Sequence, residues 1–525
     1  MSRDQLTGWD SLTRRRFMGL SASGLALVGF AGCSSDAESP PDAKPRRGGV
    51  LQFAVTDAGK SELLDPVQAL NQHHGIYCAL LWDYLLDFDE AYRPKPRLAT
   101  SVESNGAATT WRIKLRSDVK FHDGKPFTSK DVAWTVKRIL EKKNASPQYG
   151  YATRVLDPSR IETPDPQTVV FRLKAPDALF PLLFAVNGSQ IVQDGWEPDG
   201  VATNAVGTGA FVGQRWKAGN GFEFERNPNY WNGEVYLDGI RSVVIPDPSS
   251  KIQSVLSGPS HATDNIPPAQ IAIAEGTAGV EVSRVPAFYH TYIVMDTTRK
   301  PFDNPDVRTA FKLAANREQT LKNAYAGAGV LGADCSAPVN SPFFPSELRR
   351  EQDTAKAKEL LAGAGYPNGI DIELIAAPVI GGIDDLAVTY AAAAKDAGIR
   401  VNIKQWPVDT YFSEVWLKKD FYVDYLVRTH PLKALQLSFV PGAPFNQTFL
   451  KDTRAPEFTD RGLAETDSEK RADITREAMT WQADTEGIIT PAFLDRITLL
   501  KSSVGGVKQT SVGRGRSFAN AWLKS

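Results

Sequence analysis

The sequence of 525 residues has very little cysteine and no excess of charge of either sign. Its three cysteines are Cys33, Cys78 and Cys335, and without a Cys-x-x-Cys pair a zinc or thioredoxin-type site has no support. The chain carries 60 Lys and Arg against 61 Asp and Glu, and 42% of its residues are hydrophobic. Nucleic-acid binding needs a basic surplus, and disorder needs few apolar residues with high net charge. We expect a folded body with no nucleic-acid partner.

Motifs of catalysis are also scarce. From residue 34 onward the chain has no Gly-x-Ser-x-Gly, no His-Glu-x-x-His and no Walker A motif. Ser117 and Lys120 fit Ser-x-x-Lys, but they lie in a strand-like segment and no Lys-Thr-Gly follows. The six histidines lack metal-ligand spacing. We therefore expect no enzyme, no metal and no cofactor, and an exported hydrolase is the alternative.

The first 32 residues have the features of an export signal. Arg14 and Arg15 precede an apolar run, rich in small residues, that ends just before Cys33. This run of about 16 residues is shorter than the ~20 that a membrane-spanning helix needs. An uncleaved membrane anchor is the alternative interpretation. No later stretch is long and apolar enough to span a membrane.

Two details of this segment resemble known bacterial signals. Arg14 and Arg15 resemble the pair of a twin-arginine signal, and Cys33 resembles the lipidated cysteine of a lipobox, with Phe30 where Leu is usual. A lipobox product carries at least two acyl chains, which is enough for stable anchoring. Residues 33–47 are polar and rich in proline, and we expect a flexible linker between the membrane and the folded body.

Helical and strand-like patterns alternate along the body and indicate an α/β protein. Alternating or β-branched segments predict strands over 49–55, 111–116, 169–173, 370–375 and 399–403. Apolar spacing and capping residues predict helices over 76–86, from Thr128 or Ser129, from Asp306, from Asp353 and over 386–397. The last two strands and the helix between them have a βαβ-like order.

Eight stretches, in this order, resemble the family 5 solute-binding proteins of ABC importers, the dipeptide-, oligopeptide- and nickel-binding group. They are residues 64–66, 80–85, 95–99, 114–124, 206–211, 225–231, 306–310 and 356–366. The resemblance implies a two-lobed periplasmic-binding-protein-like fold (type II, cluster C) with a domain inserted in lobe I. It implies lobe I at 48–87, 200–284 and 487–525, the insertion at 88–199, and lobe II at 285–486.

The resemblance also implies a function. A monomer anchored outside the cytoplasmic membrane captures a peptide or peptide-like solute between its hinged lobes. It then delivers the solute to a permease and ATPase complex. An oligosaccharide, an anionic metabolite or a nickel chelate is the alternative solute, and a surface sensor or adhesin that reuses the fold is a further alternative.

Most of the matching motifs are expected to be structural, with Gly207 and Gly209 at a tight turn. Peptide-binding relatives use an aspartate of lobe II for the peptide amino terminus, whereas Arg428 and His430 occupy that region here. Arg428 could clamp a carboxylate or make a structural salt bridge, and His430 could add a donor. Other candidate ligand-binding residues, each with core packing as its alternative, are His73, His74, Trp406, Tyr411, Trp416 and Asn446. Cys78 and Cys335 are either a disulfide or two small buried residues.

Overall fold

The computed structural model describes residues 44–56, 63–68, 72–89, 91–198, 204–217, 219–443, 445–509 and 516–524, without the side chains of 72, 73 and 516. The predictions for Arg14, Arg15 and Cys33 lie outside the described residues. Residues 45–525 form one compact unit. Among the described residues, no helix has the length and apolar character needed to cross a membrane.

The described part contains the following elements. The helices are α1 (Gln72–Leu81), α2 (Ser129–Leu140), α3 (Tyr149–Val155), α4 (Pro248–Leu256), α5 (Pro268–Glu275), α6 (Pro305–Ala314), α7 (Arg317–Asn323), α8 (Thr354–Gly363), α9 (Ile383–Ala394), α10 (Val408–Glu414), α11 (Pro431–Ser438), α12 (Arg454–Ala464) and α13 (Ser468–Thr485). The longer strands are β1 (Val50–Val55), β4 (Ala99–Ser104), β5 (Thr110–Leu115), β6 (Ile161–Asp165), β7 (Thr168–Arg172), β8 (Phe211–Lys217), β9 (Gly221–Arg226), β10 (Gly239–Val244), β12 (Val280–Met295), β14 (Ile370–Ala376), β15 (Ile399–Gln405), β16 (Phe421–Val427) and β17 (Ile488–Lys501). The short strands are β2 (Leu86–Phe88), β3 (Pro94–Pro96), β11 (Ala262–Asp264), β13 (Gly329–Leu331), β18 (Val504–Gly505), β19 (Lys508–Gln509), β20 (Arg516–Ser517) and β21 (Trp522–Leu523).

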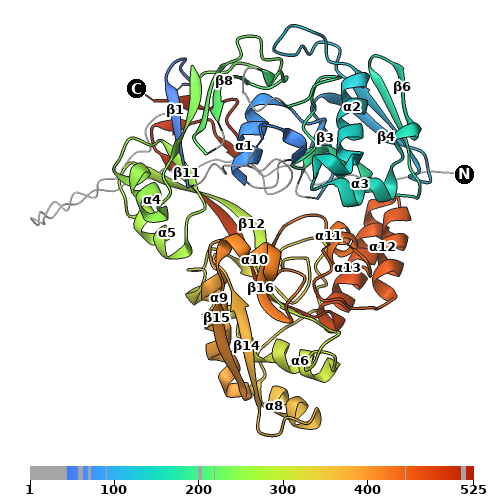
Figure 1. The fold of residues 1–525 in the computed structure, drawn as a ribbon, viewed down its shortest axis with the longest axis vertical. Helices are drawn as coiled ribbons and strands as arrows, with labels where there is room; N and C mark the ends of the chain where they lie inside the picture. The colour runs from blue at the N-terminus through green and yellow to red at the C-terminus, as the bar shows by residue number, and fades with distance from the viewer. Residues whose placement is uncertain are drawn as a thin grey trace, which may run out of the picture. The chain divides into compact units, whose positions relative to one another are not determined.

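One sheet runs through most of the molecule (Figure 1). Its order is β15-β14-β16-β12-β17-β11-β1-β10-β9-β8, and β13 pairs with β17 off this path. We call the part around β1 and β8–β11 lobe I and the part around β14–β16 lobe II. The long antiparallel strands β12 and β17 run through both lobes, so each lobe is built on the same pair of strands.

An irregularity interrupts the β12–β17 ladder between the two lobes. The register shifts between Val285 and Tyr289, and Ala287 lies in the left-handed region at φ 48°. The Ala287 N–H donates to Asp495 Oδ1 at 3.1 Å, and the Arg496 guanidinium lies 4.0 Å from the centre of the Phe288 ring. A β-bulge of this kind bends a strand and increases its local twist.

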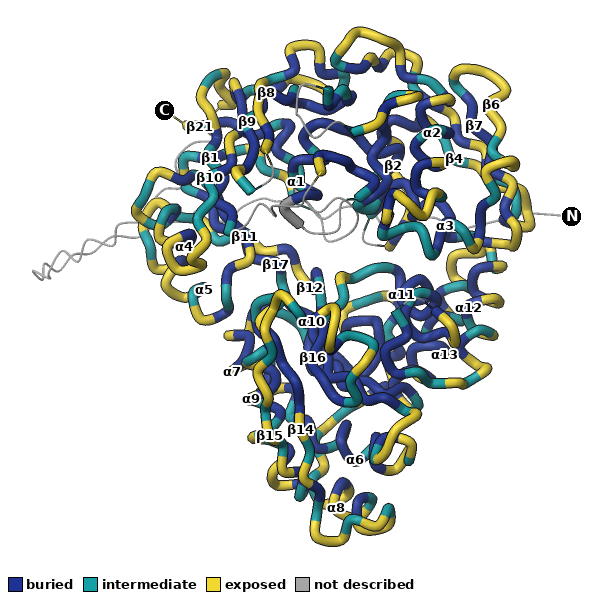
Figure 2. Tube along the Cα trace, viewed as in Figure 1, coloured by how far each residue is buried: buried dark blue, intermediate teal, exposed yellow. Residues whose placement is uncertain are grey.

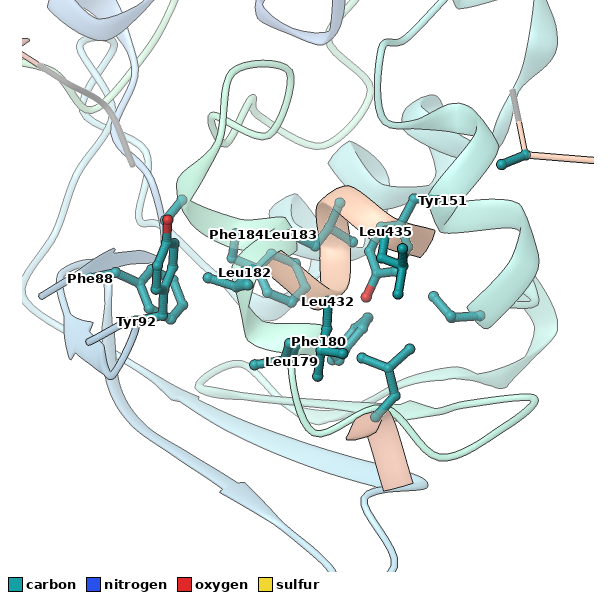
Figure 3. Packing of buried hydrophobic residues seen from close by; sticks show 14 of the residues in the cluster. Phe88, Tyr92, Tyr151, Leu179, Phe180, Leu182, Leu183, Phe184, Leu432 and Leu435 are labelled. Carbon is teal, nitrogen blue, oxygen red and sulfur yellow. The ribbon is translucent and has the colours of Figure 1, made fainter. Parts of the chain in front are cut away.

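Residues 88–199, which we call the inserted segment, carry a separate antiparallel sheet of order β4-β5-β7-β6. Helix α2 begins as predicted, because Thr128 and Asp131 form a capping box. A single hydrophobic cluster joins this segment to lobe II, and it includes Phe180, Phe184, Leu432 and Leu435. Figure 3 shows these side chains packed together, and Figure 2 shows α11 among the buried parts of the chain.

Lobe II contains the expected βαβ unit. Strands β14 and β15 pair in parallel, with α9 between them in the sequence. Asp353 caps α8, as predicted, and accepts from the Lys356 N–H at 2.8 Å. The prediction that Asp306 caps a helix is wrong, because Asn304 is the N-cap of α6. Pro305 has the backbone angle that suits the first helical position, so the helix begins before Asp306.

Predicted motif residues of lobe I and of the inserted segment meet in a buried polar network around Asp83. Its carboxylate accepts from Arg97 Nε at 3.1 Å, Thr208 Oγ1 at 3.2 Å and Trp231 Nε1 at 2.8 Å. Tyr230 adds a hydroxyl at 3.3 Å. These residues come from four of the eight stretches of the resemblance, so those stretches share a structural role, as expected.

Gly207 and Gly209 pack closely against the backbone at the end of α1. A Cβ atom on Gly207 would overlap the carbonyl oxygen of Leu81, and one on Gly209 would overlap that of Leu80. Helix α1 therefore ends at Leu81, earlier than the predicted residue 86, with the backbone of residues 207–209 against its last turn. The sequence predicts that these glycines allow a tight turn. In the structure glycine is needed because a side chain would collide with the backbone of α1.

Cys78 and Cys335 are both buried and both free thiols. Of the two interpretations of the sequence, the structure therefore has the second, in which each is a small buried residue. Burial raises the pKa of the Cys335 thiol to about 12, so this group is a weak nucleophile.

The Asp83 network predicts a large loss of stability when its carboxylate is removed. We expect Asp83→Ala to lower the free energy of unfolding by about 3–5 kcal/mol, because it removes the buried partner of the Arg97 guanidinium and leaves only the more distant Asp87, at 3.7 Å. Chemical denaturation measures this change. The control is Asp371→Ala, which breaks an exposed pair with Arg400 and should change the stability little. Equal effects of the two substitutions would contradict the role given to the network.

Candidate functional site

The candidate site lies on lobe II, beside the strands that both lobes share. Helix α10 exposes Val408 and Phe412, and the end of β16 exposes Val427, with 42–50% of each residue accessible. Large apolar side chains this exposed are uncommon in the described part of the chain. Strand β16 pairs with β12, and α10 contacts β16 through the hydrogen bond from the Tyr411 hydroxyl to the Val423 carbonyl. In Figure 1 these elements lie at the end of lobe II that is nearer to lobe I. We call Val408, Phe412 and Val427 the apolar wall.

Aromatic side chains extend this wall. The Phe412 ring centre lies 6.2 Å from that of Trp416, and Trp416 lies 5.7 Å from Phe445. Trp406 is half-buried and donates from Nε1 to Thr410 Oγ1 at 3.1 Å. Lys404 and Lys419 place their Nζ atoms 5.4 and 5.6 Å from the Trp406 ring. The predicted residues Trp406 and Trp416 therefore lie at the apolar wall, where their rings can stack on a ligand.

Arg428 lies just beyond the end of β16, next to the bulge of β12. Its backbone N–H donates to the Phe288 carbonyl at 2.9 Å, and its side chain is half-buried. Asp424, Leu426 and Arg428 lie on one face of the strand, since alternate residues share a face. Arg428 thus places a cationic residue beside the bulge of β12, and its guanidinium has two parallel N–H donors that suit a carboxylate.

His430 lies apart from this wall. It is buried, it is the N-cap of α11, and its Nδ1 accepts from the Leu432 N–H at 3.2 Å. Its ring packs against Tyr92 and Phe343, with centroid distances of 5.3 and 4.4 Å. Arg428 and His430 are close in the sequence, but they have different surroundings.

Tyr411, Asn446 and His74 make contacts within the protein. The fully buried Tyr411 hydroxyl donates to the Val423 carbonyl at 2.6 Å. Asn446 donates to the Val440 carbonyl at 3.2 Å and accepts from the Phe449 N–H at 2.9 Å. His74 is buried in α1, and its ring stacks on Tyr77 with 6.0 Å between centroids. The side chain of His73 lies outside the described residues. Ligand contact by these four residues stays a prediction.

Asp424 is a buried acid that the sequence analysis did not single out. It is 2% exposed, its Oδ1 has no hydrogen-bond partner, and no ion pair of the described residues includes it. Burial raises the pKa of its carboxyl to about 7, although the Tyr425 backbone and the Gln447 and Trp416 side chains favour the ionised form. In the sequence, the one signal for this residue is an acidic side chain inside an otherwise apolar strand segment. Asp424 shares Trp416 with the aromatic side of the candidate site.

One glycine pattern could suggest a nucleotide site. Gly327, Gly329 and Gly332 have the spacing Gly-x-Gly-x-x-Gly. In a dinucleotide-binding fold this pattern follows a strand and opens a helix. Here Gly329 begins the strand β13, which pairs with β17. A Cβ on Gly329 would overlap the Phe493 carbonyl, so close strand packing accounts for this glycine.

Comparison with known proteins assigns the chain to a protein family. Residues 93–427, more than half of the chain, match the model of the bacterial extracellular solute-binding proteins, family 5. The chain belongs to this family. Among the described residues, no group of three or more His, Cys, Asp or Glu side chains is arranged to hold a metal ion.

Individual relatives are binding proteins. The chain is 28% identical, over 68% of its length and 67% of the relative's, to the glutathione-binding protein GsiB of Escherichia coli O1:K1 / APEC. It is 31% identical, over 57% of its length and 61% of the relative's, to di/tripeptide-binding protein 3 of Pseudomonas aeruginosa (strain UCBPP-PA14). The structure of DppA from Helicobacter pylori with the peptide STSA superposes with a TM-score of 0.77 at 23% identity, over 91% of this chain and 99% of that one. The predicted two-lobed fold and the predicted family are confirmed.

The raised pKa of Asp424 predicts a pH-dependent effect of Asp424→Asn. The unfolded carboxyl ionises near pH 3.8 and the folded one near pH 7, so ionisation favours the unfolded state and wild-type stability falls as the pH rises between these values. We expect the free energy of unfolding of the variant, relative to wild type, to rise over this range by about 2–4 kcal/mol and to stay level above pH 7. Denaturation curves at a series of pH values measure the difference.

The control for this experiment is Asp371→Asn. Hydrogen bonding with Arg400 lowers the pKa of the exposed Asp371 carboxyl, so this variant should lose stability relative to wild type only as the pH rises toward 4, and the difference should stay level above pH 4. A relative stability of Asp424→Asn that does not change with pH would show that the carboxyl has an ordinary pKa in the folded protein.

Proposed function

We propose that this protein is the lipid-anchored, extracytoplasmic binding component of an ABC importer. It captures a peptide or peptide-like solute between lobes I and II and delivers it, chemically unchanged, to a permease and ATPase complex. The observation that carries this proposal is the apolar wall with Arg428, placed beside the two strands that the lobes share. Family membership and the peptide- and glutathione-binding relatives support it.

The bulge in the β12–β17 ladder suits a hinge for this mechanism. Hinge closure needs a few residues that absorb changes in backbone angle between otherwise rigid bodies. The bulge at Ala287 lies between the parts of β12 that serve the two lobes. A solute that fits the closed arrangement better than the open one shifts the population toward closure. The lobe boundaries given from the sequence are part of this proposal.

The chemistry of the wall favours a solute with an apolar or aromatic side chain and a carboxylate. Val408, Phe412 and Trp406 offer apolar surface, and Arg428 offers a bidentate partner for the carboxylate. Small peptides combine both groups. The position before Pro431 holds the buried His430, and the nearby Arg428 is a cation, so neither offers a carboxylate to a peptide amino terminus. The amino terminus of a peptide therefore needs another partner in this protein.

Solute capture is tested with purified residues 34–525, titrated with dipeptides, tripeptides and glutathione by calorimetry. A ligand at 100 times its Kd should add about 2.7 kcal/mol to the stability. We expect Arg428→Ala to weaken binding at least about tenfold, or 1.4 kcal/mol, because the carboxylate loses its counter-charge. The control is Arg400→Ala, an exposed arginine of β15 that pairs with Asp371. Turnover of a substrate without stable capture of any peptide would refute the proposal.

Anchoring is tested in bacterial cells. We expect the mature chain to fractionate with membranes and to become soluble after Cys33→Ser, because the acyl chains attach to that thiol. Replacing Arg14 and Arg15 by Lys should retain the chain in the cytoplasm if export uses the twin-arginine route. Mass spectrometry of the mature N-terminus identifies the modified residue. An unmodified Cys33 on a membrane-bound chain would assign the anchoring to the uncleaved apolar segment.

A further inference from the structure

A cavity of about 210 Å³ lies where the inserted segment meets lobe II, apart from the apolar wall. Both parts of the chain contribute aromatic side chains to it. They are Phe88, Tyr92 and Trp111 from the inserted segment, and Phe343 and His430 from lobe II. Figure 3 shows Phe88 and Tyr92 side by side, with Leu182 of the same cavity next to them. The volume suits a ligand with a single ring.

His430 lines this cavity, and one of its two ring nitrogens is a hydrogen-bond donor. The Leu432 N–H occupies Nδ1, so the ring carries its proton on Nε2. No described residue accepts a hydrogen bond from this Nε2–H. Burial, with the charges of Arg471 and Lys433, keeps the pKa of His430 well below its ordinary value, so the ring is a neutral donor. Tyr92 and Phe343 hold it from two sides.

Arg471, in the first turns of α13, supplies a cation at the same cavity. It is half-buried, and Nη1 donates to the carbonyls of Glu465 and Thr466 at 2.7 and 3.4 Å. The nearby Asp467 carboxylate instead accepts from the Glu469 and Lys470 N–H groups. No carboxylate of the described residues forms an ion pair with Arg471. The Nε and Nη2 edge of its guanidinium is thus available for a carboxylate of a ligand.

The other cations near the cavity have partners. Lys433 Nζ donates to the buried Asp177 at 2.6 Å, and Arg93 Nε donates to Asp89 at 2.9 Å with its side chain 75% exposed. Arg471 interacts with the charges of Glu465, Asp467 and Asp177 without an ion-pair contact to any of them. It is therefore the cation best placed to contact an anion inside the cavity, since a half-buried guanidinium attracts an anion more strongly than an exposed one.

We propose that this cavity is a second ligand site, which binds a small aromatic carboxylate with its ring against the contiguous cluster of Tyr92, Phe343 and His430 and its carboxylate on Arg471. The site is separate from the proposed solute site, so one can exist without the other. A ligand here contacts the inserted segment and lobe II at once. It therefore strengthens the junction that the buried Lys433–Asp177 pair already holds.

Three probes with one ring and different charge test this site: phenylacetate, 2-phenylethanol and phenethylamine. They are titrated into residues 34–525 by calorimetry or ligand-observed NMR. We expect phenylacetate to bind with a Kd of about 1 mM or tighter, and at least about tenfold more tightly than the other two. Equal binding of all three probes, or no binding of phenylacetate at about 10 mM, would overturn the proposal.

Two substitutions locate the binding. Arg471→Gln should weaken phenylacetate about tenfold and leave 2-phenylethanol within about twofold, because only the carboxylate contact is lost. Ser468→Trp, at an exposed position of the cavity lining, should block all the probes by filling the entrance. The matched control is Arg461→Gln on the surface of α12, which should change nothing. Circular dichroism and the melting temperature verify that each variant is folded.

The outcomes also separate this site from the solute site. If phenylacetate binding survives both Arg471→Gln and Ser468→Trp but is displaced by a bound peptide, the probe occupies the solute site and the second site does not exist. If the probe binds as proposed and no peptide binds anywhere, the second site stands and the proposed function fails.

Discussion

The pairing of β12 with β17 is the constraint on which the rest of the structure depends. These strands form the only antiparallel ladder of the described residues that serves both lobes, and the sheets of lobe I and lobe II extend from its two ends. A bulge at Ala287 interrupts the ladder between the lobes, where Asp495 and Arg496 of β17 contact the irregular backbone and Phe288. A continuous ladder fixes the direction of both lobes, and the bulge locates the bend between them.

Two buried ion pairs hold the parts around this ladder, and the two members of each pair come from distant parts of the sequence. Arg138 of α2 donates to both oxygens of Asp65, at 3.0 and 2.8 Å, and Lys433 of α11 donates to Asp177. The first pair joins the inserted segment to lobe I, and the second joins it to lobe II. Removal of one member of such a pair leaves a buried charge, so these contacts fix the arrangement of the parts even where their net energy is small.

The side chains with a functional interpretation are mostly outside these buried networks. Arg97, Thr208 and Trp231 are hydrogen-bonded to the buried Asp83 within the protein. The apolar wall on α10 and β16 is instead exposed, and Arg471 lines its cavity without an ion-pair contact among the described residues. Stability and recognition are thus assigned to different residues, since a group that is fully bonded inside the protein gains little from binding a solute.

The sequence by itself determined the α/β class, the family, the βαβ unit of lobe II and caps such as Asp353, because periodicity and capping act over a few neighbouring residues. It also identified Trp406, Trp416 and Arg428, which lie at the proposed site. It did not separate His430 from Arg428, and it missed Asp424 and Arg471. Those differences arise from contacts between residues far apart in the chain, such as Phe343 with His430. Only the tertiary structure decides which polar groups are buried, which are paired and which reach a cavity.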